Sequence, residues 1–371
     1  MEAVTELNDD VNNQTPIDWD DLYFDLKNER AILVLGPEFY NSEGVSIKEL
    51  LYKELTKKSD HGILHFYPSN GIFLFKSEFY KTKAQKLASQ FYKMLETDQN
   101  ILQKIIELPF KMIINTNPDK ILDRTYKEKG IECQFDYFTW RPNKKEKEIA
   151  EPDNYYPLIF NLFGSVDSYD SIVLDFEDIF EHLKTLLNNI NVSDVIRSVL
   201  NETDTYIFIG FHLQKWDTQL LFRYLNMKEH GFDDSKKNYI TRSIDIDSNS
   251  ESFFRQQFNL KYYGVPVDFL DEIHKRYFEI SIKEETEQTK GLSHSKVIEL
   301  YISSDEIEKA LSHLTIYFNN QDLSQDLIMI KSNFARYMYL KNKRLESTQE
   351  LEIQRNKIKE SILENTKSFK N

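Results

Sequence analysis

The chain has 371 residues and a mass of 44.2 kDa, and 40% of its residues are hydrophobic, enough for a substantial core and more than one domain. Its 47 basic and 61 acidic side chains give a net charge of -14. That charge disfavours a direct nucleic-acid partner, because phosphate backbones are bound by clustered Lys and Arg. The single cysteine, Cys133, excludes an internal disulfide and a thiolate zinc site. We expect no metal.

The N-terminal segment and the apolar runs of the chain predict no membrane signal. Residues 1–16 are polar and acidic, with no basic segment ahead of an apolar one, so they predict a disordered arm and no signal peptide. No apolar run reaches the roughly 18 residues that a membrane span needs. We therefore expect a protein of the reducing cytoplasm that contacts no membrane.

From residue 17 to residue 282, short apolar runs alternate with segments of helical period. The runs that predict buried strands are 31–35, 110–114, 135–140, 155–163 and 206–209. Helical periodicity is found at 19–27, 46–55, 80–95, 100–108, 121–126, 178–200 and 216–225. Wholly apolar strands are typical of parallel sheets that are covered on both faces. The sequence thus predicts an α/β domain, a Rossmann-like parallel sheet sandwiched by helices.

Four of the predicted strands end in residues that could meet a ligand. These ends are Gly36-Pro37-Glu38, Thr116-Asn117-Pro118-Asp119, Gly164-Ser165 and Gly210-Phe211-His212. In open parallel sheets ligands bind at the carboxyl ends of the strands. We therefore expect the four loops to converge on one crevice.

Each of these loops also has an ordinary structural explanation. The loop at Gly36 is not GxGxxG, and a strand-to-helix turn alone requires a glycine. Asn117 and Asp119 suit a ribose or a water, but Asn-Pro-Asp is also a common turn and helix start. His212 suits a base or a surface residue. Ser165 has no GxSxG frame, which argues against serine hydrolysis.

The composition changes after the predicted α/β domain. Residues 283–296 are polar, contain Gly291 and predict a linker, and residues 297–371 predict a small helical module. We expect three helices there, over 307–318, over 327–338 and from Ser347 onwards. Ser303 with Glu306, and Ser347 with Glu350, have the spacing of capping boxes.

The order of the strand-end motifs resembles the sirtuin-like family of Rossmann-type NAD-consuming domains. The matching segments are LVLGPEFY, IINTNPDKILD, FNLFGSVD and FIGFHLQKWDTQLLFRYL, and the resemblance spans about residues 19–270. The sequence is most similar to the divergent sirtuin-like domains of bacterial antiviral defence, which hydrolyse NAD⁺ to starve an infected cell. Those domains also lack the four-cysteine zinc module.

The resemblance implies a role for each motif. Asn117 matches the asparagine that binds the ribose or orients the attacking water, and Asp119 matches the acidic residue two positions later. Gly36 matches the first glycine of the phosphate loop, but Glu38 then lies where a pyrophosphate would pass. His212 replaces a serine beneath the adenosine ribose. The implied contacts to NAD or a related nucleotide are Gly36, Pro37, Glu38, Asn117, Gly164, Ser165, Gly210, Phe211 and His212.

Phe163 falls where the family has its catalytic histidine. A base at this point is worth roughly 10²–10⁴-fold in rate, and a phenyl ring cannot accept a proton. Three explanations stay open: the domain binds its nucleotide without turnover, another group such as His212, Glu38 or Asp119 serves as the base, or the domain is a scaffold.

The C-terminal segment LIMIKSNFARYMYLKNKRLESTQELEIQRNKIKESILE resembles the small effector-associated domains of bacterial conflict systems. Such domains pair with like domains on a partner; the alternative is an ordinary helical extension. The two resemblances predict an antiphage defence protein that binds an NAD-type nucleotide, forms a homo-oligomer and couples to an effector through residues 297–371. An NAD hydrolase activated by oligomerisation is the alternative, and a non-enzymatic scaffold is the third.

Overall fold

The computed structural model describes residues 17–40, 45–142, 147–228, 231–233, 235–241, 248–318, 325–343 and 346–367. The chain divides into two compact units, Met1–Phe278 and Glu279–Asn371. The arm that we predicted at residues 1–16 lies outside the described residues.

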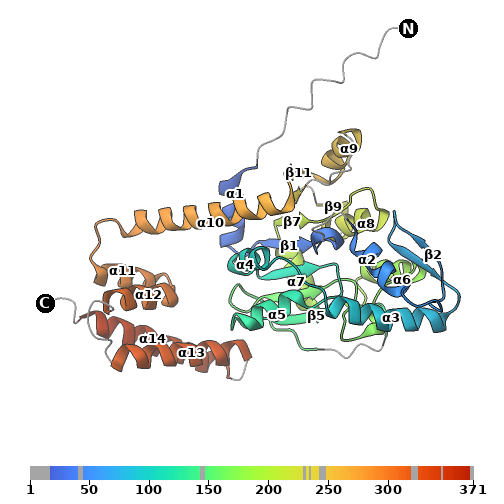
Figure 1. The fold of residues 1–371 in the computed structure, drawn as a ribbon. Coiled ribbons are helices and arrows are strands. Elements are labelled where there is room, and N and C mark those ends of the chain that lie inside the picture. The colour runs from blue at the N-terminus through green and yellow to red at the C-terminus, as the bar shows by residue number, and fades with distance from the viewer. Residues whose placement is uncertain are drawn as a thin grey trace, which may run out of the picture. The chain divides into compact units, whose positions relative to one another are not determined.

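The first unit is built on a seven-stranded sheet with the order β11-β10-β7-β1-β4-β6-β5 (Figure 1). Every neighbouring pair in it is parallel, which confirms the predicted Rossmann-like sheet. The strands are β1 (Ala31–Leu35), β4 (Met112–Asn115), β5 (Gln134–Tyr137), β6 (Leu158–Asn161), β7 (Thr205–Ile209), β10 (Lys237–Thr241) and β11 (Leu260–Tyr263).

Helices cover both faces of this sheet, as predicted. Successive strand residues point to opposite faces, so Ile32 and Val34 belong to one core and Leu33 and Leu35 to the other. The first core contains side chains of α6 (Phe176–Leu187), α7 (Asp194–Glu202), α8 (Trp216–Leu225) and α9 (Ser248–Phe258). The second contains side chains of α1 (Trp19–Lys27), α4 (Gln99–Glu107), α5 (Ile121–Glu128) and the start of α10 (Pro266–Thr289).

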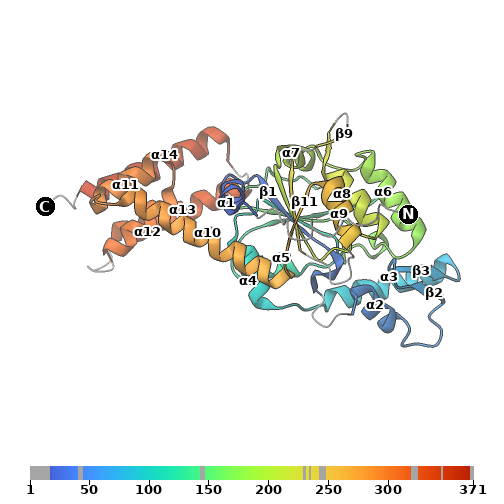
Figure 2. The same ribbon diagram turned by 90° about the horizontal axis from the view of Figure 1, so that it is seen from above.

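A small layer, here called the cap, lies beside the sheet (Figure 2). It consists of α2 (Ile47–Leu55), the antiparallel strands β2 (Ile63–Tyr67) and β3 (Ile72–Phe75), and α3 (Glu78–Lys93). Its apolar side chains pack on Val166, Ile172 and Leu174, which follow β6. The sequence predicted the two helices but not the hairpin between them. The remaining short elements are η2 (Pro37–Tyr40), η3 (Tyr169–Ser171), β8 (Met227–Lys228) and β9 (Gly231–Phe232).

One predicted helix is divided in the structure. The segment 178–200 was predicted as a single helix, but α6 ends at Leu187 and α7 begins at Asp194. Asn189 and Asn191 between them have positive φ angles of 53° and 62°, a conformation that asparagine tolerates better than most residues. Ser193 then caps α7 through the amide of Ile196. The turn, not the apolar period, decides where the helix stops.

Besides the end of α10, the described residues of the second unit form four helices, α11 (His294–Ser303), α12 (Ile307–Phe318), α13 (Gln325–Lys343) and α14 (Thr348–Lys367). They share one apolar core. The prediction of a C-terminal helical module is confirmed, but its helix count was wrong because α11 begins inside the predicted linker. The rest of that linker is also mostly helical: α10 continues to Thr289, since KEETEQT consists of residues compatible with a helix, and the chain turns at Gly291, where φ is 74°.

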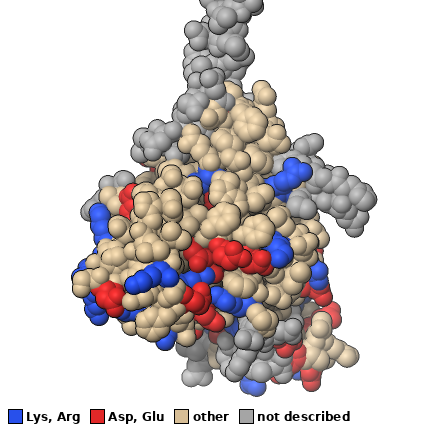
Figure 3. Space-filling model, turned by 90° about the vertical axis from the view of Figure 1, so that its right-hand side faces the viewer, with Lys and Arg blue, Asp and Glu red and all other residues tan. Residues whose placement is uncertain are grey.

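None of the described helices is long and apolar enough to cross a bilayer. Acidic and basic side chains are interspersed on the face shown in Figure 3. That face therefore presents mixed charge.

Candidate functional site

A cavity lies at the carboxyl ends of the adjacent strands β7, β1, β4 and β6. All four strand-end loops contribute to it, and the cap and the start of α8 complete its wall. It encloses roughly 690 Å³ of empty space, including the part that is open to solvent. The lining residues are Pro37, Lys48, Asn70, Gly71, Tyr92, Thr116, Asn117, Pro118, Phe163, Ile172, Val173, Ile179, His212, Lys215, Asp217 and Thr218.

Asn117 lines the cavity and is held in place by its neighbours. The side-chain oxygen of Asn115 accepts the amide N–H of Asn117 at 3.0 Å. The Asn117 side-chain amide donates to the carbonyl of Pro37 at 3.3 Å, which joins the loops after β4 and β1. The asparagine is thus fixed at the cavity wall, where its amide can meet a ligand.

Asp119 does not line the cavity, and its contacts are those of a structural residue. One carboxylate oxygen accepts the amide N–H of Ile121 at 2.9 Å, at the start of α5, and the other accepts the side-chain amide of Asn115 at 3.1 Å. The side chain of Asn161 donates to the Asp119 carbonyl at 2.6 Å. Asp119 is 1% exposed, so it shapes the loop that carries Asn117.

Phe163 lines the cavity at the position implied for the catalytic base. The ring of His182, from α6, packs behind it with ring centroids 4.9 Å apart. His182 is fully buried, and its Nε2 lies 2.6 Å from the carbonyl of Leu162. A carbonyl only accepts, so Nε2 carries the proton in this contact. Burial lowers the pKa of His182 to about 4, so its imidazole is neutral at pH 7.

The two glycine loops close on each other. The amide of Gly36 donates to the Ile209 carbonyl at 2.7 Å, the amide of Glu38 to the Gly210 carbonyl at 3.1 Å, and the amide of Phe39 to the Gly36 carbonyl at 3.2 Å. A Cβ on Gly36 would lie 2.1 Å from the Gly210 oxygen. A Cβ on Gly210, where φ is 77°, would lie 2.4 Å from the Phe39 nitrogen. These glycines are required for contact between the loops.

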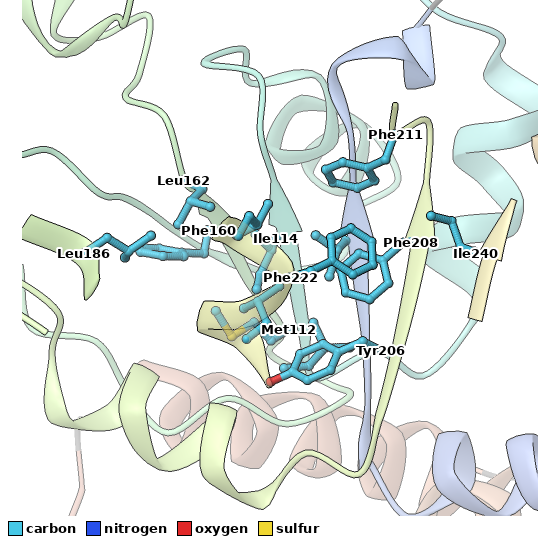
Figure 4. Packing of buried hydrophobic residues seen from close by; sticks show 14 of the residues in the cluster. Met112, Ile114, Phe160, Leu162, Leu186, Tyr206, Phe208, Phe211, Phe222 and Ile240 are labelled. Atoms are coloured by element: carbon cyan, nitrogen blue, oxygen red, sulfur yellow. The ribbon is translucent and has the colours of Figure 1, made fainter. Parts of the chain in front are cut away.

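Three further candidate residues also lie outside the cavity lining. Gly164 has a φ of 90°, and a Cβ there would lie 2.2 Å from the Ser171 carbonyl. Ser165 is fully buried, and its amide donates to the Ser171 hydroxyl at 2.9 Å. Phe211 packs against Phe208 and Phe222 in the core (Figure 4). All three serve loop and core packing.

Two lysines that the sequence analysis did not identify reach the cavity. Lys48 comes from α2 in the cap, and its ammonium donates to the Val173 carbonyl at 3.1 Å. Burial, and then the charge of Lys215, lower the pKa of Lys48 to about 8. Lys215 directly precedes α8 and lies inside the quoted motif FIGFHLQKWDTQLLFRYL. That motif was its only sequence signal, and nothing in the spacing singled out Lys48.

Acidic groups lie beside these lysines. Oε1 of Glu38 lies 3.8 Å from the Lys215 ammonium and 3.9 Å from Nε2 of His212. The Glu38 side chain is 10% exposed, and neither of its oxygens has a hydrogen-bond partner among the described residues. Burial raises the pKa of Asp217, which lines the cavity. The cavity wall therefore combines two ammonium groups, an imidazole and the Asp217 carboxylate, and the Glu38 carboxylate lies beside Lys215 outside the lining.

No group of three or more His, Cys, Asp or Glu in the described part of the chain is arranged to hold a metal ion. The arrangement of a primary amide, two ammonium groups and an apolar floor instead suits a small polar organic ligand, because such sites combine apolar lining with a few placed polar groups.

Comparison with known families identifies both parts of the chain. Residues 111–263 match the SIR2-like domain, and residues 293–368 match Effector-associated domain 11. No curated protein sequence matches the chain significantly. The first match includes Asn117, Phe163 and His212, whereas β1, Gly36 and Lys48 precede it. Both resemblances that the motifs predicted are thereby confirmed: the chain combines a SIR2-like domain with an effector-associated domain, which fits a sirtuin-like protein of a conflict system.

Proposed function

We propose that the SIR2-like domain binds NAD or an NAD-derived nucleotide in this cavity, and that nicotinamide cleavage is impaired. We propose further that the effector-associated domain couples the bound state to a partner in a bacterial antiphage defence system. One observation carries the binding proposal: Asn117 is fixed at the wall of a cavity that all four strand-end loops line.

Impaired cleavage follows from the chemistry of Phe163, which lines the same cavity as Asn117. Breaking the nicotinamide–ribose bond requires a group that accepts a proton from a hydroxyl or from water. Phe163 has no such group, and His182 behind it is buried with its Nε2 against the Leu162 carbonyl. Without a base, the rate is expected to fall by roughly 10²–10⁴-fold.

An NAD hydrolase activated by oligomerisation is the second candidate, and His212 favours it. Its imidazole lines the cavity, and Nε2 lies 3.9 Å from a Glu38 carboxylate oxygen. A carboxylate beside an imidazole stabilises the protonated form and so assists a base. In this mechanism His212 would accept the proton while Asn117 held the ribose or the water.

Calorimetric titration of the full-length protein with NAD⁺ and with ADP-ribose, together with chromatographic measurement of nicotinamide release, separates these candidates. We expect binding with little turnover, and at least tenfold weaker binding for Asn117→Ala. Asn100→Ala, an exposed position in α4, is the matched control and should bind normally. Sustained nicotinamide release that His212→Ala abolishes would establish the hydrolase. Failure to bind either nucleotide would refute the proposal.

Restoring a base tests whether Phe163 is the cause of impairment. Phe163→His should raise nicotinamide release at least tenfold over the wild-type protein, whereas Phe163→Leu, which also opens space but supplies no base, should not. A histidine variant that binds NAD⁺ normally and gains no turnover would show that the impairment has another origin.

The coupling proposal rests on the second domain, whose helices share a core of their own. Sedimentation of the full chain tests homo-oligomer formation. A purely monomeric species at tens of micromolar, with and without nucleotide, would contradict it.

A further inference from the structure

We infer that Lys48 and Lys215 form the phosphate-binding pair of the cavity and contact the diphosphate of a bound nucleotide. The identity of that nucleotide rests on the proposed function. The anion site itself rests on where the two lysines lie and on what surrounds them.

In the loop that the family resemblance assigns to phosphate, the described residues from Gly36 to Phe39 have no free amide N–H group. Between Gly36 and Phe39 the three amide N–H groups, Pro37 having none, donate to carbonyls of the two glycine loops. The Glu38 carboxylate also lies there, at 10% exposure. A phosphate at this loop would meet a carboxylate and no free N–H, so the anion must be held elsewhere.

Lys48 brings an ammonium into the cavity from the cap. Its ammonium donates one hydrogen bond, to the Val173 carbonyl at 3.1 Å, and an ammonium has three donors. The remaining donors are available for an acceptor inside the cavity that Lys48 lines. A phosphate oxygen would be a charged acceptor, and hydrogen bonds between charged groups are the stronger ones.

Lys215 supplies the second ammonium, from the start of α8. Its side chain is 18% exposed, and its charged neighbour Glu38 lies 3.8 Å away, beyond hydrogen-bond distance. The ammonium of Lys215 makes no hydrogen bond to any described residue. Buried ammonium groups are usually paired closely, because losing water without a partner is costly. This lysine therefore has unused capacity for a ligand that lies in the cavity.

Both lysines line the cavity, and the charge of Lys215 disfavours the protonated form of Lys48. An anion between them would offset that repulsion. The nearby carboxylates do not act as this anion: Asp217 accepts amide N–H groups at the start of α8, and Glu38 lies 3.8 Å from the Lys215 ammonium. They reduce the net charge of the site. Binding should therefore depend on direct contact with a compact phosphate and little on long-range attraction.

Titration with inorganic pyrophosphate and with ADP-ribose tests the pair in the full-length protein. Lys48→Met and Lys215→Met should each weaken binding of both probes at least tenfold. Lys48→Arg should keep pyrophosphate binding within a few-fold, because it keeps the charge. Lys53→Met, at an exposed position of the same helix α2, is the matched control and should change affinity less than twofold. Melting curves confirm that each variant is folded.

The outcomes separate this inference from the proposed function. ADP-ribose binding that survives both lysine substitutions refutes the pair but keeps the function. If the wild-type protein binds pyrophosphate but neither NAD⁺ nor ADP-ribose, and the lysine substitutions abolish that binding, the pair is supported and the proposed function is refuted. A wild-type protein that binds neither pyrophosphate, NAD⁺ nor ADP-ribose refutes both the lysine pair and the proposed function. Glu38→Gln should strengthen pyrophosphate binding several-fold; weaker binding would show that Lys215 depends on Glu38 for its position.

Discussion

The cavity has two walls of opposite construction. On one side the loops after β1 and β7 are sealed by their own backbone: Gly36 and Gly210 touch, and their amides and carbonyls hydrogen-bond to each other's loops. Beside them Lys48, from α2, and Lys215, directly before α8, present long side chains whose ammonium groups have few hydrogen bonds. The wall that carries Gly36 and Gly210 is closed by backbone contacts, and the open wall carries the ammonium groups of Lys48 and Lys215.

The difference shows that close packing of two loops is by itself a sufficient reason for a glycine at a strand end. A glycine is needed wherever a backbone approaches another group closely, and that group can be the backbone of a second loop or a bound phosphate. Here the neighbour of Gly36 is Gly210. The sequence pattern alone does not distinguish these two reasons for a glycine.

The largest expected effect comes from breaking the closed wall. Gly36→Ala and Gly210→Ala should each destabilise the first unit by about 3 kcal/mol or more, because the new methyl group would lie 2.1 to 2.4 Å from backbone atoms that cannot move independently. Gly264→Ala is the control, with its nearest atom 4.0 Å away. Urea denaturation measures the difference. A loss below about 1 kcal/mol would mean that the loops separate readily.

Most of the sheet could be predicted from the sequence, because β1, β4, β6 and β7 are short, fully buried and mostly apolar. The strands β10 (KNYIT) and β11 (LKYY) were missed. Both include lysine, and β11 is one of the two edge strands, with alternate residues only half-buried. Apolar runs identify central strands, whereas an edge strand needs only one apolar side. The capping-box spacing of Ser347 and Glu350 did locate a helix start, and both hydrogen bonds are present.

The site was predictable only in part. Pro37, Asn117, Phe163 and His212 lie at the cavity because parallel strands bring their carboxyl ends together. Lys48 reaches it through the cap, whose packing depends on contacts between α2 and residues more than 100 positions later. No local pattern encodes such a contact. Conversely, polar strand-end residues such as Asp119 resemble ligand contacts in sequence although they bond to their own loop.

The loop of Phe163 provides the next test, because the neutral ring of His182 packs against the Phe163 ring. The pKa of His182 is about 4 in the folded protein, against 6.5 for an ordinary histidine. Between these values the unfolded chain binds a proton that the folded chain does not. Stability should therefore fall as the pH is lowered from 6.5 to 4, by up to about 3 kcal/mol from this residue.

His182→Phe isolates that contribution. The phenyl ring keeps an aromatic contact with Phe138 and Phe163, but it cannot be protonated, so the variant should lose this part of the acid sensitivity while losing some stability at pH 7. Denaturation curves at pH 4.5, 5.5 and 7 provide the comparison. Equal acid sensitivity in both proteins would show that His182 is accessible to protons in the folded state.

The smallest expected effect concerns the open wall. The pKa of Lys48 is about 8, against 10.5 for an ordinary lysine. The charged groups that act on it are Lys215 before α8, Asp217 in the first turn of α8, Asp178 of α6 and Glu38 after β1. Between pH 8 and pH 10.5 the unfolded chain binds the proton that the folded chain has lost. Stability should thus rise with pH across this window, by about 1 to 2 kcal/mol after allowance for the solvent in an open cavity.

Pyrophosphate should cancel this rise, since an anion beside Lys48 favours its protonated form and returns its pKa toward the ordinary value. Pyrophosphate affinity should accordingly weaken above pH 8, and binding near pH 8 should take up a proton, which calorimetry detects in buffers of different ionisation enthalpy. Lys48→Met should show neither effect. A pH-independent affinity in the wild-type protein would place the anion away from Lys48, and the open wall would then owe its anion binding to Lys215 alone.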